Sequence, residues 1–176
     1  PGLRTPWYDE ECKRRDDKRA VAEHLDINPG GSQSQFFDPL VIRSRRHERC
    51  RPPDWTGHVV YDCDTGRPEG LAESTDGPLC LWVRPDMGGK LQQGKYAGAA
   101  DISTGAGATN SVLSVYNAKL GEKVAEFATC TMSPERFAVY CNAVMWLFKD
   151  QDGLPGLFGW ESVGPGVYFG RVVQEL

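Results

Sequence analysis

Residues 95–115, KYAGAADISTGAGATNSVLSV, constrain the fold of this 176-residue chain most strongly. They predict an apolar strand that ends on a carboxylate, Asp101, and then a Gly/Ser/Thr turn and a second strand. Glycine adds no side chain and tolerates positive φ, so such a turn lets a polar ligand reach backbone and carboxylate together. A carboxylate at the mouth of a buried strand favours a divalent metal as its partner. The same pattern also fits an ordinary aspartate that opens a hairpin turn.

The second half of the chain alternates strand and helix signals. Three strands are predicted in succession, at residues 96–102, 111–117 and 122–131. Short links favour antiparallel pairing of neighbouring strands. Ser133-Pro134 is typical of a helix start, and apolar residues then recur at helical spacing. A fourth strand is predicted at 157–160, directly before Glu161, and a last helix at 167–176.

This order of elements predicts an α/β chain with the mixed sheet of an RNase H-like fold: three antiparallel strands, a crossover helix and a fourth strand. A right-handed crossover places the fourth strand beside the first and parallel to it. Asp101 and Glu161 would then lie at neighbouring strand ends, where two carboxylates can hold Mg²⁺ or Mn²⁺. Such a site can activate water against a phosphodiester. Taken alone, Glu161 also fits a surface acid at a strand end.

The first half of the chain predicts two further regions. Residues 1–35 favour a helix with a linker after it, and residues 36–95 favour a β-rich connector with strands at 58–62 and 79–83. Residues 96–176 then form the RNase H-like core. No apolar run is long enough to span a bilayer. Six scattered cysteines without a CxxC pair, and no signal peptide, favour a reducing cytoplasm.

A basic segment lies inside the predicted connector. Five arginines and one glutamate give it a local charge of +4, and the arginines are Arg43, Arg45, Arg46, Arg49 and Arg51. The segment fits phosphate contact with DNA, and it also fits a solvated surface. The net charge of the whole chain, −4, argues against a general nucleic-acid coat but allows a local basic groove.

Taken in order, the pieces TPWYDEECKRR…AVAEHLDI, FFD, KYAGAADISTGAGATNSVLSV, PERFA and WESVGPG resemble the large terminase subunit of tailed bacteriophages. The resemblance covers nearly the whole chain. It implies a metal-dependent endonuclease that cuts double-stranded DNA during genome packaging in the host cytoplasm, together with the phage portal and small terminase subunit. By position it implies that Asp101 and Glu161 are catalytic acids that hold Mg²⁺ or Mn²⁺.

The chain departs from this family in two ways. It has no GxxxxGK[ST] phosphate loop, so the ATPase motor is expected to be absent. The family's third metal-binding acid lies on a later helix, and none of Asp150, Asp152 and Glu175 stands where the pattern would put it. The nuclease core is therefore expected to be incomplete at its C-terminal end.

Two alternatives stay open. The piece DISTGAGATNSVLSVYNAKLGEKVAE also resembles the first phosphate-binding hairpin of actin-like and sugar-kinase-type phosphotransferases. Those enzymes need a second, duplicated domain, which 176 residues cannot supply. The other alternative is a non-catalytic remnant or docking domain.

Overall fold

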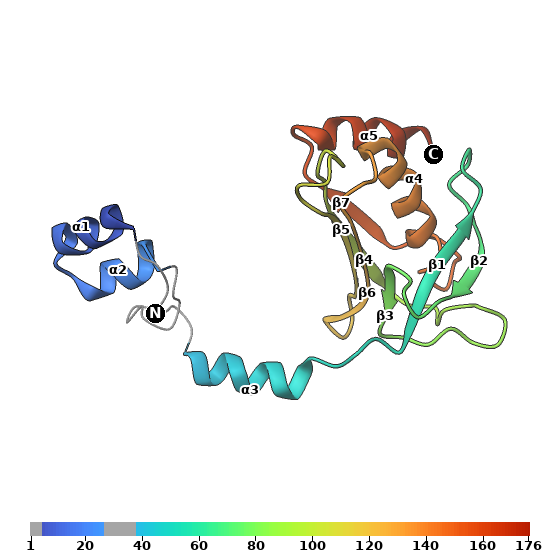
Figure 1. Ribbon diagram of the computed structural model, residues 1–176. Helices are drawn as coiled ribbons and strands as arrows, with labels where there is room; N and C mark the ends of the chain where they lie inside the picture. Colours follow the sequence, from blue (N-terminus) through green and yellow to red (C-terminus); the bar gives the residue numbers. More distant parts are fainter. Residues whose placement is uncertain (1–4, 27–37) are drawn as a thin grey trace. The chain divides into compact units, whose positions relative to one another are not determined.

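The computed structural model describes residues 5–26 and 38–176. It divides the chain into two compact units, Pro1–Arg51 and Pro52–Leu176 (Figure 1). The predicted boundary at 35/36 lies outside the described residues, as does the greater part of the predicted linker. The described part of the predicted connector 36–95 is divided between the two units, and the 95/96 boundary falls within the second.

The first unit contains three helices: α1 (Pro6–Arg15), α2 (Lys18–His24) and α3 (Pro39–Arg49). Local signals form α1: the Thr5 side chain caps its start, and its last turn carries three basic residues. Asp16, with a φ of 45°, ends the helix in a left-handed conformation. The helical pattern predicted from the sequence is therefore broken into two helices, α1 and α2, which contact each other.

The sequence patterns did not predict α3, because its arginines interrupt any apolar stripe. The Asp38 carboxylate nevertheless accepts a hydrogen bond from the Leu40 N–H at 2.7 Å, and Pro39 occupies the first turn. Within the described residues, no helix is both long and apolar enough to cross a membrane.

The second unit is a mixed α/β structure built on a seven-stranded sheet with the order β2-β1-β3-β6-β5-β4-β7. Its strands are β1 (Trp55–Tyr61), β2 (Pro68–Glu73), β3 (Leu79–Leu81), β4 (Tyr96–Asp101), β5 (Ser111–Asn117), β6 (Glu122–Thr129) and β7 (Leu157–Trp160). The β4–β5–β6 meander is antiparallel, as the sequence predicts. β7 pairs with β4 and runs parallel to it.

The strands β1–β3 extend this sheet rather than forming a separate connector. β3 pairs with β6, with Leu79 opposite Phe127, so residues on both sides of the predicted 95/96 boundary share one core. The sequence analysis predicted no strand at β2, where Pro68 and Gly70 leave Leu71 as the one large apolar residue. β2 forms at the end of the sheet order, where such residues are tolerated.

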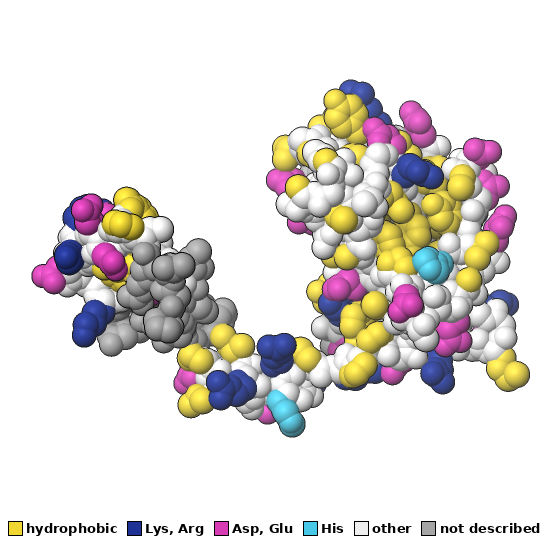
Figure 2. Space-filling view, in the orientation of Figure 1, with side chains coloured by type: hydrophobic (Ala, Val, Ile, Leu, Met, Phe, Trp, Pro, Cys, Tyr) yellow, Lys and Arg dark blue, Asp and Glu magenta, His cyan; other side chains and the backbone are white. Residues whose placement is uncertain are grey.

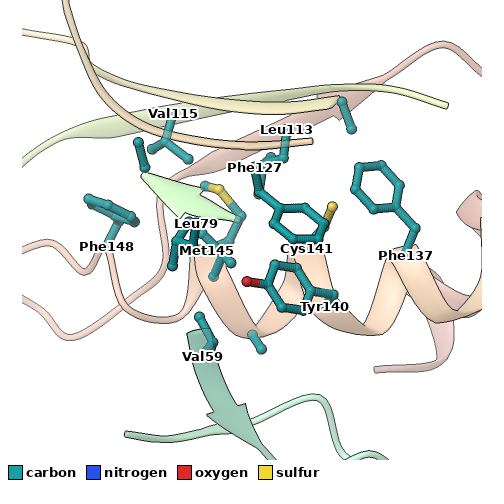
Figure 3. Packing of buried hydrophobic residues seen from close by; sticks show 14 of the residues in the cluster. Val59, Leu79, Leu113, Val115, Phe127, Phe137, Tyr140, Cys141, Met145 and Phe148 are labelled. Atoms are coloured by element: carbon teal, nitrogen blue, oxygen red, sulfur yellow. The ribbon is translucent and has the colours of Figure 1, made fainter. Parts of the chain in front are cut away.

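Two helices complete the second unit: α4 (Pro134–Met145) and α5 (Pro165–Glu175). Ser133 caps α4 and Pro134 starts it, as predicted. α4 contacts β1 and β5, and α5 packs on α4 (Figure 1). Figure 3 shows α4 side chains, among them Phe137 and Cys141, pointing toward side chains of the strands. This buried layer makes the sheet a rigid support for its strand ends.

Candidate functional site

The parallel pairing of β4 and β7 brings the two predicted acids to adjoining strand ends. Ala97 lies opposite Leu157, and Ala100 lies opposite Trp160. Extending that register by one residue sets Asp101 beside Glu161, and both residues are exposed. The pairing of the acids depends on the crossover through α4, since they are far apart in the sequence.

Asp101 lies on the sheet face opposite α4. Burial alternates along β4, where Tyr96, Gly98 and Ala100 are buried on the helix side. A Cβ atom at Gly98 would lie only 2.4 Å from the Met145 Sδ atom, so α4 packs directly against this strand. The alternation of a strand then directs Asp101 away from the core.

The start of α5 packs closely on the backbone of Glu161. A Cβ atom at Gly166 would lie 1.8 Å from the Glu161 carbonyl oxygen and 3.9 Å from a methyl carbon of Ile102. Gly164, at the N-cap, has a φ of 53°, which favours glycine. Sequence reasoning predicted the last helix at 167–176 but missed this contact. This close approach holds the backbone of Glu161 against the first turn of α5.

The turn after Asp101 is held by two serines that sequence reasoning also missed. The Ser103 N–H donates to the Ser111 Oγ at 2.9 Å, and the two hydroxyl oxygens are 3.1 Å apart. Ser111 is fully buried, and a buried hydroxyl needs such partners. Its place as the first residue of a predicted strand, after a Ser/Thr/Gly turn, was the available signal.

The glycines of this turn pack against the connection between β6 and α4. Gly105 has a φ of 72°, and a Cβ there would lie 2.3 Å from the Met132 carbonyl oxygen. The Gly105 N–H donates to the Ser103 Oγ at 3.3 Å, and the Gly107 N–H donates to the Cys130 carbonyl at 2.8 Å. These two N–H groups already have partners within the chain, so they do not form a free phosphate cradle.

The carboxylates fit a hard divalent cation in donor chemistry, because Mg²⁺ and Mn²⁺ bind oxygen ligands. Among residues 5–26 and 38–176, no group of three or more His, Cys, Asp or Glu side chains is placed so that it could hold a metal ion. Asp101 and Glu161 would supply at most two protein ligands to such an ion, and its remaining positions would go to water or substrate oxygens.

Asp150 and Asp152 lie at the other end of β4. Together with Lys95 and Tyr96 they line an open cavity of about 780 Å³. The Asp150 carboxylate accepts hydrogen bonds from the backbone N–H groups of Asp152 and Leu154, both at 2.9 Å, so it stabilises its own turn. These acids therefore do not complete the pair at the opposite end of the strand.

The predicted DNA-binding arginines belong to the first unit. Arg43, Arg45, Arg46 and Arg49 lie on α3, and Arg51 follows the helix; all five are exposed. Arg45 is paired with Glu48, with 3.3 Å between Arg45 Nη1 and Glu48 Oε2. Asp101 and Glu161 belong to the second unit.

Comparison of the chain with protein-family models, curated proteins and solved structures gives no significant match. The resemblance to terminases therefore stays a prediction from the sequence.

Proposed function

We propose that this chain is the RNase H-like nuclease region of a phage large terminase subunit, a metal-dependent endonuclease that cuts double-stranded DNA during genome packaging. The parallel register of β4 and β7 carries the proposal, because it sets Asp101 beside Glu161. The order β6-β5-β4-β7 supports it further. Three antiparallel strands with a fourth placed parallel beside the first are what an RNase H-like sheet requires.

Asp101 and Glu161 would hold Mg²⁺ or Mn²⁺ between them. When bound, the metal would polarise a phosphodiester oxygen and lower the pKa of a water molecule. The protein's own contribution is positional. Gly166 and the start of α5 fix Glu161, and the serine pair fixes the turn after Asp101. Two like charges at adjoining strand ends repel each other, and a cation between them relieves that repulsion.

The turn itself favours a nuclease over a kinase-like phosphotransferase. A phosphate-binding hairpin presents free backbone N–H groups to its ligand. Here the N–H groups of Gly105 and Gly107 are bonded to Ser103 and Cys130. In this proposal the exposed arginines of the first unit meet the DNA backbone. The portal and the small terminase subunit are partners that follow from the resemblance.

Nicking of supercoiled plasmid in Mn²⁺ tests the proposal. We expect cutting by the chain, and a loss of roughly a hundredfold or more in Asp101→Asn and in Glu161→Gln. Removing even an outer partner of a metal ligand costs about 10- to 100-fold. Asp152→Asn is the matched control, since it removes an exposed acid at the other end of β4, and it should cut normally. Plasmid nicking that persists in Asp101→Asn would contradict the assignment of Asp101 to the active site. Absence of cutting by the unaltered chain in both Mn²⁺ and Mg²⁺ would favour a non-catalytic domain.

A further inference from the structure

The helix α3 is exposed along its whole length. Every residue from Asp38 to Pro52 is exposed. The helix is held by its own cap at Asp38 and by local side-chain pairs. An isolated helix of this length is marginal in water. A partner that binds along α3 would therefore stabilise it, and its side chains indicate what that partner is.

The charged side chains of α3 are sorted onto two sides of the helix. Arg43, Arg46 and Arg49 recur at intervals of three, which places them along one side. Glu48 lies on the opposite side, where the Ser44 Oγ donates to it at 2.7 Å and Arg45 pairs with it. No acidic partner of the three arginines is found within the described residues. The dark-blue side chains along this helix in Figure 2 are arginines, because α3 contains no lysine.

The apolar residues of α3 do not form a stripe of their own. Leu40, Val41 and Ile42 are 69%, 55% and 52% exposed. Because they are consecutive, they point in three directions about 100° apart. A helix that lies in a lipid interface or an apolar groove needs its apolar residues on one side. The three apolar residues therefore do not form one binding face on α3.

The chemistry of the arginine side matches a polyanionic backbone. Guanidinium groups bind phosphate oxygens through two parallel hydrogen bonds. Arginines three residues apart are separated by about 4.5 Å along a helix. Phosphates recur about every 3.4 Å of axis on each strand of duplex DNA. Long arginine side chains span the difference, so the three can meet a run of phosphates.

We infer that Arg43, Arg46 and Arg49 form a contact with the phosphate backbone of double-stranded DNA that does not depend on base sequence. Arg45 remains paired with Glu48 and contributes little. This inference rests on the proposed DNA substrate. It narrows the proposed DNA contact from five arginines to three. The contact belongs to the first unit, so it needs neither Asp101 nor a metal ion.

The test is DNA binding by the full chain carrying Asp101→Asn, measured in EDTA by fluorescence anisotropy on a short duplex of mixed sequence over a salt series. The triple variant Arg43→Gln, Arg46→Gln, Arg49→Gln keeps helix-forming side chains. We expect its slope of log K against log salt to be less steep by about 2.7, which is about 0.9 for each lost phosphate contact. At 0.1 M salt its affinity should fall by roughly a hundredfold.

Three further variants make the test specific. Arg45→Gln should change the slope little. The triple variant Lys90→Gln, Lys95→Gln, Lys119→Gln removes the same charge from exposed positions of the second unit and should bind DNA nearly as the parent does. Replacing Arg43, Arg46 and Arg49 by lysine should keep the salt slope but weaken binding, because lysine keeps the charge and loses the paired hydrogen bonds.

An unchanged salt slope in the arginine-to-glutamine triple variant would overturn the inference. An equal loss of DNA affinity in the variant that replaces Lys90, Lys95 and Lys119 by glutamine would overturn it too. Loss of binding to anionic lipid vesicles with unchanged DNA binding would also overturn it and would indicate a membrane surface. The two proposals fail separately. Arginine-dependent binding without Mn²⁺ cutting would refute the nuclease and leave the DNA contact standing. If the unaltered chain cuts DNA but the α3 arginine variants bind DNA as the parent does, the nuclease proposal stands and the α3 contact is refuted.

Discussion

The two units of this chain form their helices for different reasons. α1 and α3, in the first unit, bury no residue, whereas α4, in the second, buries eight of its twelve. Caps and pairs such as Glu11–Arg14 hold the exposed helices. Burial against the sheet holds α4. The first unit leaves the side chains of its helices exposed, so they are free to contact a polyanion. The packed core of the second unit can hold the strands that carry Asp101 and Glu161 in a fixed register.

The largest expected effect is on stability, when one leucine is replaced in each unit. Leu113 is 1% exposed in the sheet, and Leu40 is 69% exposed on α3. Leu113→Ala should lower the free energy of unfolding by about 2–5 kcal/mol, because it removes buried methyl groups and leaves a cavity. Leu40→Ala should change it by less than about 0.5 kcal/mol. Urea unfolding of both variants checks this, and similar losses in the two would break the comparison.

Gly166 tests how firmly the second unit fixes its site. Gly166→Ala places a Cβ atom against the Glu161 carbonyl oxygen, so either the helix or the strand end must shift. We expect a cost of about 1–3 kcal/mol in unfolding free energy and weaker Mn²⁺ binding. Gly159→Ala is the control in the same region, since a Cβ there meets no atom within 4 Å. Thermal unfolding and calorimetry measure both effects, and an unperturbed Gly166→Ala variant would show that the contact is not tight.

The smallest effect concerns the charge pairs of the first unit. Hydrogen bonds from Arg14 and then Arg15 lower the pKa of Glu11 from 4.5 to about 2. A carboxylate with a lowered folded pKa stabilises the fold above its unfolded pKa, and that stabilisation is lost as pH falls from about 4.5 toward 2. An NMR titration of Glu11 should show the low pKa. Helix content should lose part of its acid sensitivity in Glu11→Gln but not in Glu10→Gln. A Glu11 that titrates at 4.5 would contradict the pairing.

The sequence predicted those elements whose signals are local. The strand at 157–160 and the capped helix at Ser133-Pro134 were both predicted, because alternation, capping residues and helical spacing coincide there. α3 was missed because its arginines hide the helical period, although Asp38-Pro39 is a start signal. The register that brings Asp101 to Glu161 was predicted from topology rather than from either residue alone.

Contacts that form only in the folded chain could not be predicted from local patterns. The pairing of β3 with β6 joins residues that short-range signals placed in different domains. The Ser103–Ser111 hydroxyl pair and the close approach of Gly166 to Glu161 also depend on the folded chain. The placement of Asp101 beside Glu161 was thus predictable, whereas the contacts around the two residues were not.

A crystal structure of the chain with Mn²⁺ soaked in tests the central claim most directly. The ion's anomalous signal locates it independently of the protein. The account predicts one Mn²⁺ ion between the carboxylates of Asp101 and Glu161, and its loss in Asp101→Asn. An ion bound at Asp150 and Asp152 instead, or carboxylates of Asp101 and Glu161 that remain without metal at saturating Mn²⁺, would contradict it.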